Sequence, residues 1–94
     1  MGKQELAGRL VQKFVAQTSA DVQELTTIIR EQDATRLSLV AHRIKGSAAN
    51  VSAEAIRESA SRLEILGREG NLAAAPEIQA QLRAQLEAVK AQPF

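Results

Sequence analysis

The sequence is poor in several residue types on which common functions depend. It has no cysteine, which excludes disulfides, zinc–thiolate sites and thiol catalysis. Its single histidine, His42, excludes a metal site built from several histidines. Aromatic residues make up only 2% of the chain, too few for the stacking platforms that hold unpaired bases in many nucleic-acid-binding modules. We therefore expect no metal ion and no nucleic-acid partner.

Long apolar runs and an excess of one charge are absent as well. No stretch approaches the roughly 20 apolar residues of a membrane span, and the start of the chain lacks the apolar segment of a signal peptide. The net charge of +1 does not select DNA, a membrane or an acidic ligand. The 94 residues, 45% of them apolar, suffice for one hydrophobic core. We expect a single cytoplasmic domain over residues 1–94 that makes no membrane contact.

What the chain does have is the composition and the periodicity of helices. Alanine, leucine, glutamine, glutamate and arginine dominate, and apolar residues recur every three or four positions. This pattern predicts four amphipathic helices, over residues 4–31, 34–50, 53–69 and about 71–90. The first is either one continuous helix or two helices that meet at a kink near Thr18, because Ser19 and Asp21 could start a second helix.

Capping residues mark the boundaries of these helices. Asp33 is a good N-cap for the second helix, Ser52 can cap the third, and Gly70 suits the position just after the third. Pro76 fits only near the first turn of the last helix. The short connections place consecutive amphipathic helices antiparallel to each other. The predicted fold class is therefore all-α, an antiparallel up-down four-helix bundle.

One apolar stripe from each helix forms the expected core. The four stripes are Leu10, Phe14, Thr18, Val22, Leu25 and Ile29; Leu37, Val40, Ala41, Ile44, Ala48 and Val51; Ile56, Ala60, Leu63 and Leu66; and Ala75, Ile78, Leu82, Leu86 and Val89. On the surface, the pairs Glu58–Arg62 and Glu64–Arg68 have the order and spacing that favour ion pairs along a helix.

The second helix has features that a purely structural helix would avoid. Its apolar stripe centres near Ile44, and at about 100° per residue His42 lies about 160° from that centre, on the outer side. Leu39 and Ala49 lie on the same side and would expose apolar surface. Gly46 costs roughly 1 kcal/mol relative to alanine in mid-helix. A glycine one turn from an exposed histidine leaves an accessible notch, with an apolar rim to which a partner could dock.

The same helix is basic. Arg36, Arg43 and Lys45 are its only charged residues, and this local excess suits an anionic group or an acidic partner. An imidazole with an unperturbed pKa of about 6.5 is mostly neutral and nucleophilic at neutral pH. Its attack on a phosphoryl group would give phosphohistidine, whose negative charge Lys45 could offset. The plainer alternative is that His42 is an incidental surface residue and the basic stretch is simply solvated.

The segment from Ala41 to Val51 resembles the phosphorylation motif of histidine-containing phosphotransfer (HPt) domains of two-component phosphorelays. The family pattern is a histidine, any residue, an aliphatic residue, lysine, glycine, then small residues and an aliphatic residue. In this chain it reads Ala41-His42-Arg43-Ile44-Lys45-Gly46-Ser47-Ala48-Ala49-Asn50-Val51. The resemblance extends over about residues 10–90. The chain departs from the pattern at Ser52, where the family usually has glycine, and this affects turn geometry rather than chemistry.

The resemblance implies a four-helix bundle whose exposed histidine accepts phosphate from a receiver-domain aspartate and passes it to another receiver. His42 would be the phosphoacceptor and Lys45 the neighbouring cation. The docking surface for the receiver would consist of Leu39, Arg43, Gly46 and Ala49. The chain is either a free-standing protein or a domain excised from a longer chain, and the Met1–Gly2 start and the domain-sized length favour the second. The resemblance then implies a hybrid sensor kinase, at whose cytoplasmic end the domain would lie.

Glu64 has two interpretations. If the second and third helices form a hairpin centred on Ser52, the residue level with His42 is near Arg62, and Glu64 lies within a turn of that level. Its carboxylate could accept a hydrogen bond from Nδ1–H of His42 and leave Nε2 free to attack, as in some members of the family. Alternatively, Glu64 is an exposed residue that pairs with Arg68.

Other functions compete with the phosphoryl carrier. A helical protein-interaction or dimerisation module would use Leu39 and Ala49 as contacts, with His42 incidental. A signalling-kinase domain of the chemotaxis type shares the His-x-x-Lys-Gly pattern, but takes its phosphate from an ATP-binding domain. The chain has no glycine-rich phosphate loop of its own, so we expect no cofactor and no kinase activity.

Overall fold

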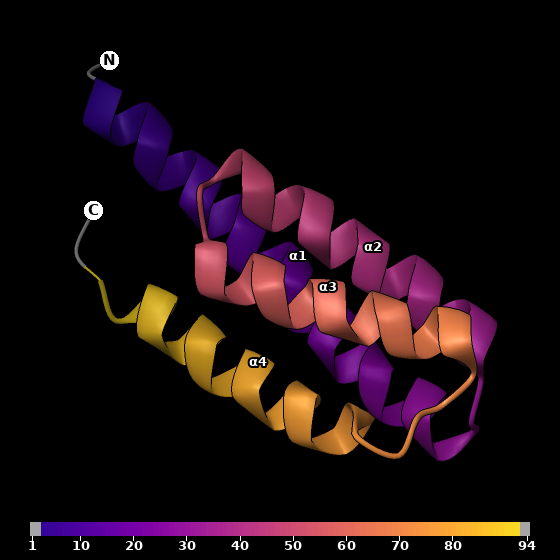
Figure 1. The fold of residues 1–94 in the computed structure, drawn as a ribbon. Coiled ribbons are helices and arrows are strands. Elements are labelled where there is room, and N and C mark those ends of the chain that lie inside the picture. The colour runs from indigo at the N-terminus through magenta and orange to yellow at the C-terminus, as the bar shows by residue number, and fades with distance from the viewer. Residues whose placement is uncertain (1–2, 93–94) are drawn as a thin grey trace.

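A computed structural model describes residues 3–92 of the chain, with the side chains of residues 8–92. It contains four helices, α1 (Lys3–Arg30), α2 (Ala34–Asn50), α3 (Glu54–Glu69) and α4 (Ala75–Lys90) (Figure 1). Consecutive helices pack against each other, and α4 also packs against α1, which closes the bundle. The predicted all-α up-down bundle is confirmed. In the described part of the chain, no helix combines the length and apolar character that a bilayer crossing requires.

The ends of the first three helices share one hydrogen-bonded form. A residue with a left-handed backbone follows each helix by one or two positions. The φ values are 55° at Gln32, 58° at Ser52 and 72° at Gly70. In each case the next backbone N–H donates to a carbonyl five residues back, as in the Schellman motif. The motif satisfies carbonyls that the end of a helix leaves free, and it turns the chain sharply into the next helix. The expected role of Gly70 as the residue that ends α3 is confirmed.

Ser52 does not cap α3 as expected. It occupies the left-handed position that ends α2, and α3 starts after Ala53, which makes no side-chain cap. The left-handed conformation explains why a glycine would suit this position. Asp33 does act as predicted, because its Oδ1 accepts the backbone N–H of Arg36 at 3.1 Å at the start of α2. The last helix begins at Ala75 rather than at Asn71, whose Oδ1 instead accepts the backbone N–H of Ala73.

The first helix is continuous through Thr18, without the kink or split that the sequence allowed. With 28 residues, against 17 in α2, it projects beyond the turn that joins α2 to α3 (Figure 1). Leu10 lies toward this projecting end and is 53% exposed, so its assignment to the core was wrong. A repeat of apolar residues shows which face of a helix is apolar, but not where the neighbouring helices end.

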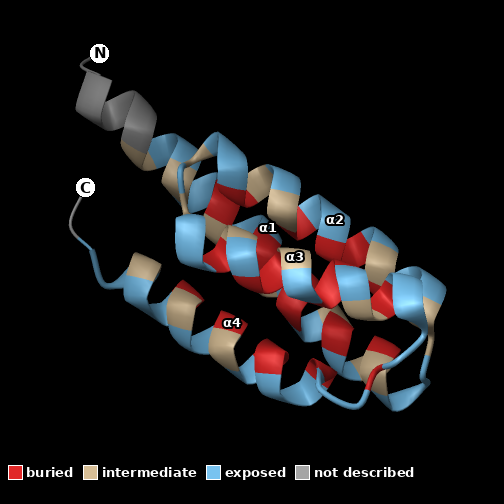
Figure 2. Ribbon diagram, in the orientation of Figure 1, coloured by how far each residue is buried: buried red, intermediate tan, exposed pale blue. Residues whose placement is uncertain are grey.

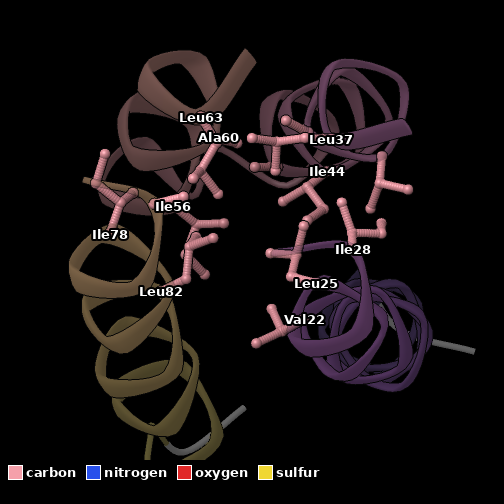
Figure 3. Close-up of a cluster of buried hydrophobic side chains, with 14 of the residues drawn as sticks. Val22, Leu25, Ile28, Leu37, Ile44, Ile56, Ala60, Leu63, Ile78 and Leu82 are labelled. Atoms are coloured by element: carbon pink, nitrogen blue, oxygen red, sulfur yellow. The ribbon is translucent and has the colours of Figure 1, made fainter. Parts of the chain in front are cut away.

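The core lies between the inner faces of the four helices (Figure 2). Side chains such as Leu25, Ile44, Leu63 and Leu82 point from different helices into one cluster (Figure 3). The predicted stripes supply most of it. Four of their members are only partly buried and pack at its edge: Ile29, Val51, Leu66 and Val89. The core also contains Ile28 and Leu72, which the apolar stripes did not predict.

Candidate functional site: an exposed histidine paired with a buried glutamate

His42 lies on the outward face of α2. The side chains of α2 that face the core are fully or almost fully buried, whereas the His42 side chain is 67% exposed. Leu39, one turn earlier, is 66% exposed, and Ala49 is also exposed. A Cβ placed on Gly46 would meet no heavy atom of the described residues within 4 Å. The face around the imidazole is therefore open and partly apolar.

Glu64 reaches this face from α3, although its side chain is only 4% exposed. Its Oε2 lies 2.8 Å from Nδ1 of His42 and 3.0 Å from Nη2 of Arg68. Its Oε1 lies 2.5 Å from Nζ of Lys45. One buried carboxylate thus accepts hydrogen bonds from side chains of both helices. Of the two interpretations of Glu64, the exposed one is wrong, since the residue is buried and contacts both His42 and Arg68.

These contacts determine the charge of Glu64. The hydrogen bond from Lys45 lowers the pKa of the Glu64 carboxyl group most, and it outweighs burial, which acts in the opposite direction. The hydrogen bond with His42 and the charge of Arg68 lower the pKa further. Glu64 is therefore ionised at neutral pH. A carboxylate only accepts hydrogen bonds, so Nδ1 of His42 must carry the hydrogen.

The imidazole consequently has its two nitrogens in different roles. Nδ1–H faces the buried carboxylate, and in the neutral ring Nε2 then carries a lone pair. The acceptor fixes the tautomer and the orientation of the ring, as partner groups do for histidines that bind metals. An exposed, oriented nitrogen with a free lone pair is a nucleophile.

Lys45 lies beside the same carboxylate. Its side chain is 31% exposed, and its ammonium group binds Glu64 rather than projecting freely into solvent. From the sequence, Lys45 was expected to act only on a phosphate carried by His42. In the structure the two residues are connected through Glu64, so the cation, the carboxylate and the imidazole form one hydrogen-bonded group.

The other basic residues of α2 face α1. Nη2 of Arg43 lies 2.6 Å from Oδ1 of Asp21, and Nη2 of Arg36 lies 3.1 Å from Oε2 of Glu24. The hydrogen bond with Asp21 raises the pKa of Arg43. Acids from α1 and α3 therefore compensate the local positive charge that we interpreted as suited to an anion. Arg43, expected in the docking surface, directs its guanidinium group toward α1.

Sequence reasoning missed one of these partners, Asp21. Asp21 is 2% exposed. It follows Thr18, a member of the apolar stripe of α1, by three residues, and this spacing could have indicated that Asp21 is buried. The pair between Glu64 and Arg68, expected from their spacing along α3, is confirmed. Arg62, expected to pair with Glu58, donates instead to Oε1 of Gln81 on α4 at 2.9 Å. The spacing of charged residues in the sequence indicates which ion pairs can form along one helix. Pairs between two helices depend on how the helices pack.

A comparison with protein families gives a match to the Hpt domain over residues 9–92, which is nearly the whole chain. Comparisons with curated proteins and with solved structures give no significant match. Hpt domains are phosphocarriers rather than kinases: they act in histidine-containing phosphotransfer in two-component signalling, where they interact with receiver domains. The match covers the helical bundle and the exposed histidine of α2 together, and on this ground the chain belongs to the Hpt domain family.

Proposed function

We propose that the chain accepts a phosphoryl group on Nε2 of His42 from the phosphoaspartate of one receiver domain and passes it to the aspartate of another. The observation that carries this proposal is the hydrogen bond between Nδ1 of His42 and the buried Glu64. It leaves Nε2 as the nitrogen with a lone pair, on a side chain that is 67% exposed. The donor we propose is the receiver of a hybrid sensor kinase, with the chain acting in the cytoplasm.

The chemistry requires one bond to form and one to break. The lone pair of Nε2 attacks the phosphorus, and the bond between phosphorus and the aspartate oxygen breaks, so that the aspartate leaves as a carboxylate. The hydrogen on Nδ1 stays in place, and the ring of the product carries a positive charge. Glu64 faces that charge from within hydrogen-bond distance and stabilises it. Transfer to the second receiver is the reverse of these steps.

Lys45 has a separate role in the proposal. Its ammonium group lies on Glu64 before transfer, and its flexible stem can bring it toward a phosphoryl group on Nε2. Glu64 would then keep His42 and Arg68 as partners and remain ionised. The carboxylate can therefore release one cation to the phosphate without losing its charge or its hold on the imidazole.

The proposed docking surface surrounds His42. Leu39 supplies exposed apolar area, while Gly46 and Ala49 leave room for a receiver to approach the imidazole. Arg43 lies at the α1 edge of this surface, where Asp21 restrains it. The receiver would supply the phosphoaspartate and most of the groups that stabilise the transition state, and this chain would supply the positioned nucleophile and docking energy.

The test is a phosphotransfer profile. Receiver domains phosphorylated on aspartate are mixed one at a time with the chain, and phosphate that is labile to acid but stable to alkali is measured on the chain over time. We expect fast transfer from a few receivers and onward transfer to at least one other. No phosphate uptake from any receiver, together with a dimer by light scattering that dissociates in Leu39→Ser, would instead support the interaction module.

A further inference from the structure

The closest approach of α2 and α3 that involves a glycine lies at Gly67, in the buried face of α3. A Cβ placed there would lie 2.6 Å from the backbone nitrogen of Ser38, 2.8 Å from the carbonyl oxygen of Ala34 and 3.0 Å from Cα of Ser38. Ordinary van der Waals contact begins at 3.4 Å. All three atoms belong to the backbone of α2, so no side-chain rotation could make room. Only glycine permits this spacing of the two helices.

This contact is next to the functional site. Gly67 follows Glu64 by three residues, which is about 4.5 Å along α3, and Ser38 precedes His42 by four residues, which is about 6 Å along α2. Because the helices are antiparallel, both steps lead to the same level of the bundle. The close backbone approach at Gly67 is therefore about one helical turn from the hydrogen bond between His42 and Glu64.

The distances at the site leave little room for separation of the helices. Nδ1 of His42 and Oε2 of Glu64 are 2.8 Å apart, and a hydrogen bond of this kind weakens beyond about 3.2 Å. A methyl group at position 67 would require the helices to separate locally by several tenths of an ångström or more. The Glu64 side chain is 4% exposed, so its surroundings restrict the rotations with which it could follow His42.

We propose that Gly67 is a positioning residue for phosphotransfer. By allowing the backbone of α3 to lie against that of α2, it holds the carboxylate of Glu64 at Nδ1 of His42 and keeps Nε2 as the nitrogen that attacks. This inference rests on the proposed function for its effect on rate, but the effect on the imidazole can be measured without any phosphate.

The test compares Gly67→Ala with Gly46→Ala. Both replace a glycine inside a helix, and both gain helix propensity, but only the first meets the backbone of another helix. Nitrogen-15 NMR of the imidazole reports the tautomer of His42. We expect Gly67→Ala to lower the melting temperature and to move part of the population from Nδ1–H to Nε2–H. We expect Gly46→Ala to raise the melting temperature and to leave the imidazole signals unchanged.

A third variant separates positioning from general loss of stability. Leu82 lies in the core on α4 and is 1% exposed, so Leu82→Ala lowers the melting temperature without touching the contact between α2 and α3. In this variant, the tautomer of His42 should remain that of the wild type. If Gly67→Ala is unfolded in buffer, trimethylamine N-oxide favours the folded state, and all variants are then compared in the same osmolyte.

The rate of phosphorylation completes the experiment. Phosphoramidate serves as a small donor: Nε2 attacks its phosphorus, the phosphorus–nitrogen bond breaks, and ammonia leaves after taking up a proton from the solvent. We expect Gly67→Ala to react about tenfold more slowly than the wild type. If no receiver and no phosphoramidate phosphorylates the wild type, the proposed function is wrong, whatever the tautomer. If the wild type is phosphorylated but folded Gly67→Ala keeps the wild-type tautomer and rate, or Leu82→Ala shifts the tautomer equally, the positioning role of Gly67 is wrong.

Discussion

Glu64 of α3 lies 2.8 Å from Nδ1 of His42 on α2, across 22 residues of sequence. The carboxylate is almost completely buried, whereas the imidazole that it holds is mostly exposed. The two ring nitrogens therefore differ, because the buried carboxylate fixes Nδ1 and leaves Nε2 with its lone pair. The candidate site is therefore a pair of residues supported by two cations, rather than a lone surface histidine.

Replacement of Glu64 by glutamine should slow phosphotransfer from a receiver by about tenfold. The amide can still accept a hydrogen bond, but it cannot balance the positive charge of the phosphorylated imidazole. Glu58→Gln, an exposed carboxylate on the same helix, is the matched control and should transfer at the wild-type rate. The measurement is single-turnover transfer with each variant. Equal rates for the two variants would show that Glu64 has no part in the reaction.

The Glu64→Gln variant also tests the pH dependence of stability. The partners of Glu64, Lys45 first among them, hold the pKa of its carboxyl group below the ordinary value of about 4.5. A group with a lowered pKa in the folded state stabilises the fold above its ordinary pKa, and this contribution is lost as the pH falls through the folded value. The advantage of the wild type over Glu64→Gln in melting temperature should therefore be constant near neutral pH and shrink as the pH falls below about 4.5. A difference that stays constant down to the acid limit of folding would contradict the assignment.

Lys45→Ala should shorten the lifetime of the phosphorylated histidine without abolishing its formation. The cation is 31% exposed and screened by solvent, so the effect should be at most about fivefold, or about 1 kcal/mol, and weaker at high salt. Phosphorus-31 NMR follows the decay directly. Arg68→Ala is the control, because it removes the other cation that binds Glu64 but leaves the lysine. A loss of lifetime that is the same in both variants, or does not depend on salt, would argue against a contact between Lys45 and phosphate.

Gly46→Gln should separate stability from docking. The position is open, so the new side chain fits the fold and the helix gains up to about 1 kcal/mol. The same side chain would project beside His42 and obstruct a receiver. We expect a higher melting temperature together with a higher KM for the receiver. A raised melting temperature with unchanged transfer kinetics would remove Gly46 from the docking surface.

Much of the fold follows from local features of the sequence. The apolar periodicity and the caps at Asp33 and Gly70 act within one or two turns of helix. The predicted helices match those of the structure to within one residue at every end except the start of α4. The errors have non-local causes. Leu10 belongs to an apolar stripe, but the neighbouring helices end before they cover it, and Ser52 adopts the left-handed conformation that ends α2 rather than a capping one.

The site could be predicted only in part for the same reason. The exposure of His42 follows from its angle on α2, and the level of Glu64 follows from a symmetrical hairpin. The burial of Glu64 and its contact with Lys45 depend on the distance between α2 and α3, which the packing at Gly67 determines. The ion pair between Asp21 and Arg43 likewise depends on the rotation of α1 against α2. Such distances and rotations depend on the packing of the whole bundle, so no local pattern in the sequence predicts them.

The most direct test of the proposed function is to find the atom that carries the phosphate. A chain labelled with nitrogen-15 is phosphorylated by a receiver that transfers to it, and the phosphorus–nitrogen coupling is read by NMR, with His42→Gln treated in the same way. We predict phosphate on Nε2 of His42, hydrogen on Nδ1, and no uptake by His42→Gln, which should remain folded because the replaced side chain is 67% exposed. Phosphate on Nδ1 or on another residue, or equal uptake by folded His42→Gln, would contradict it.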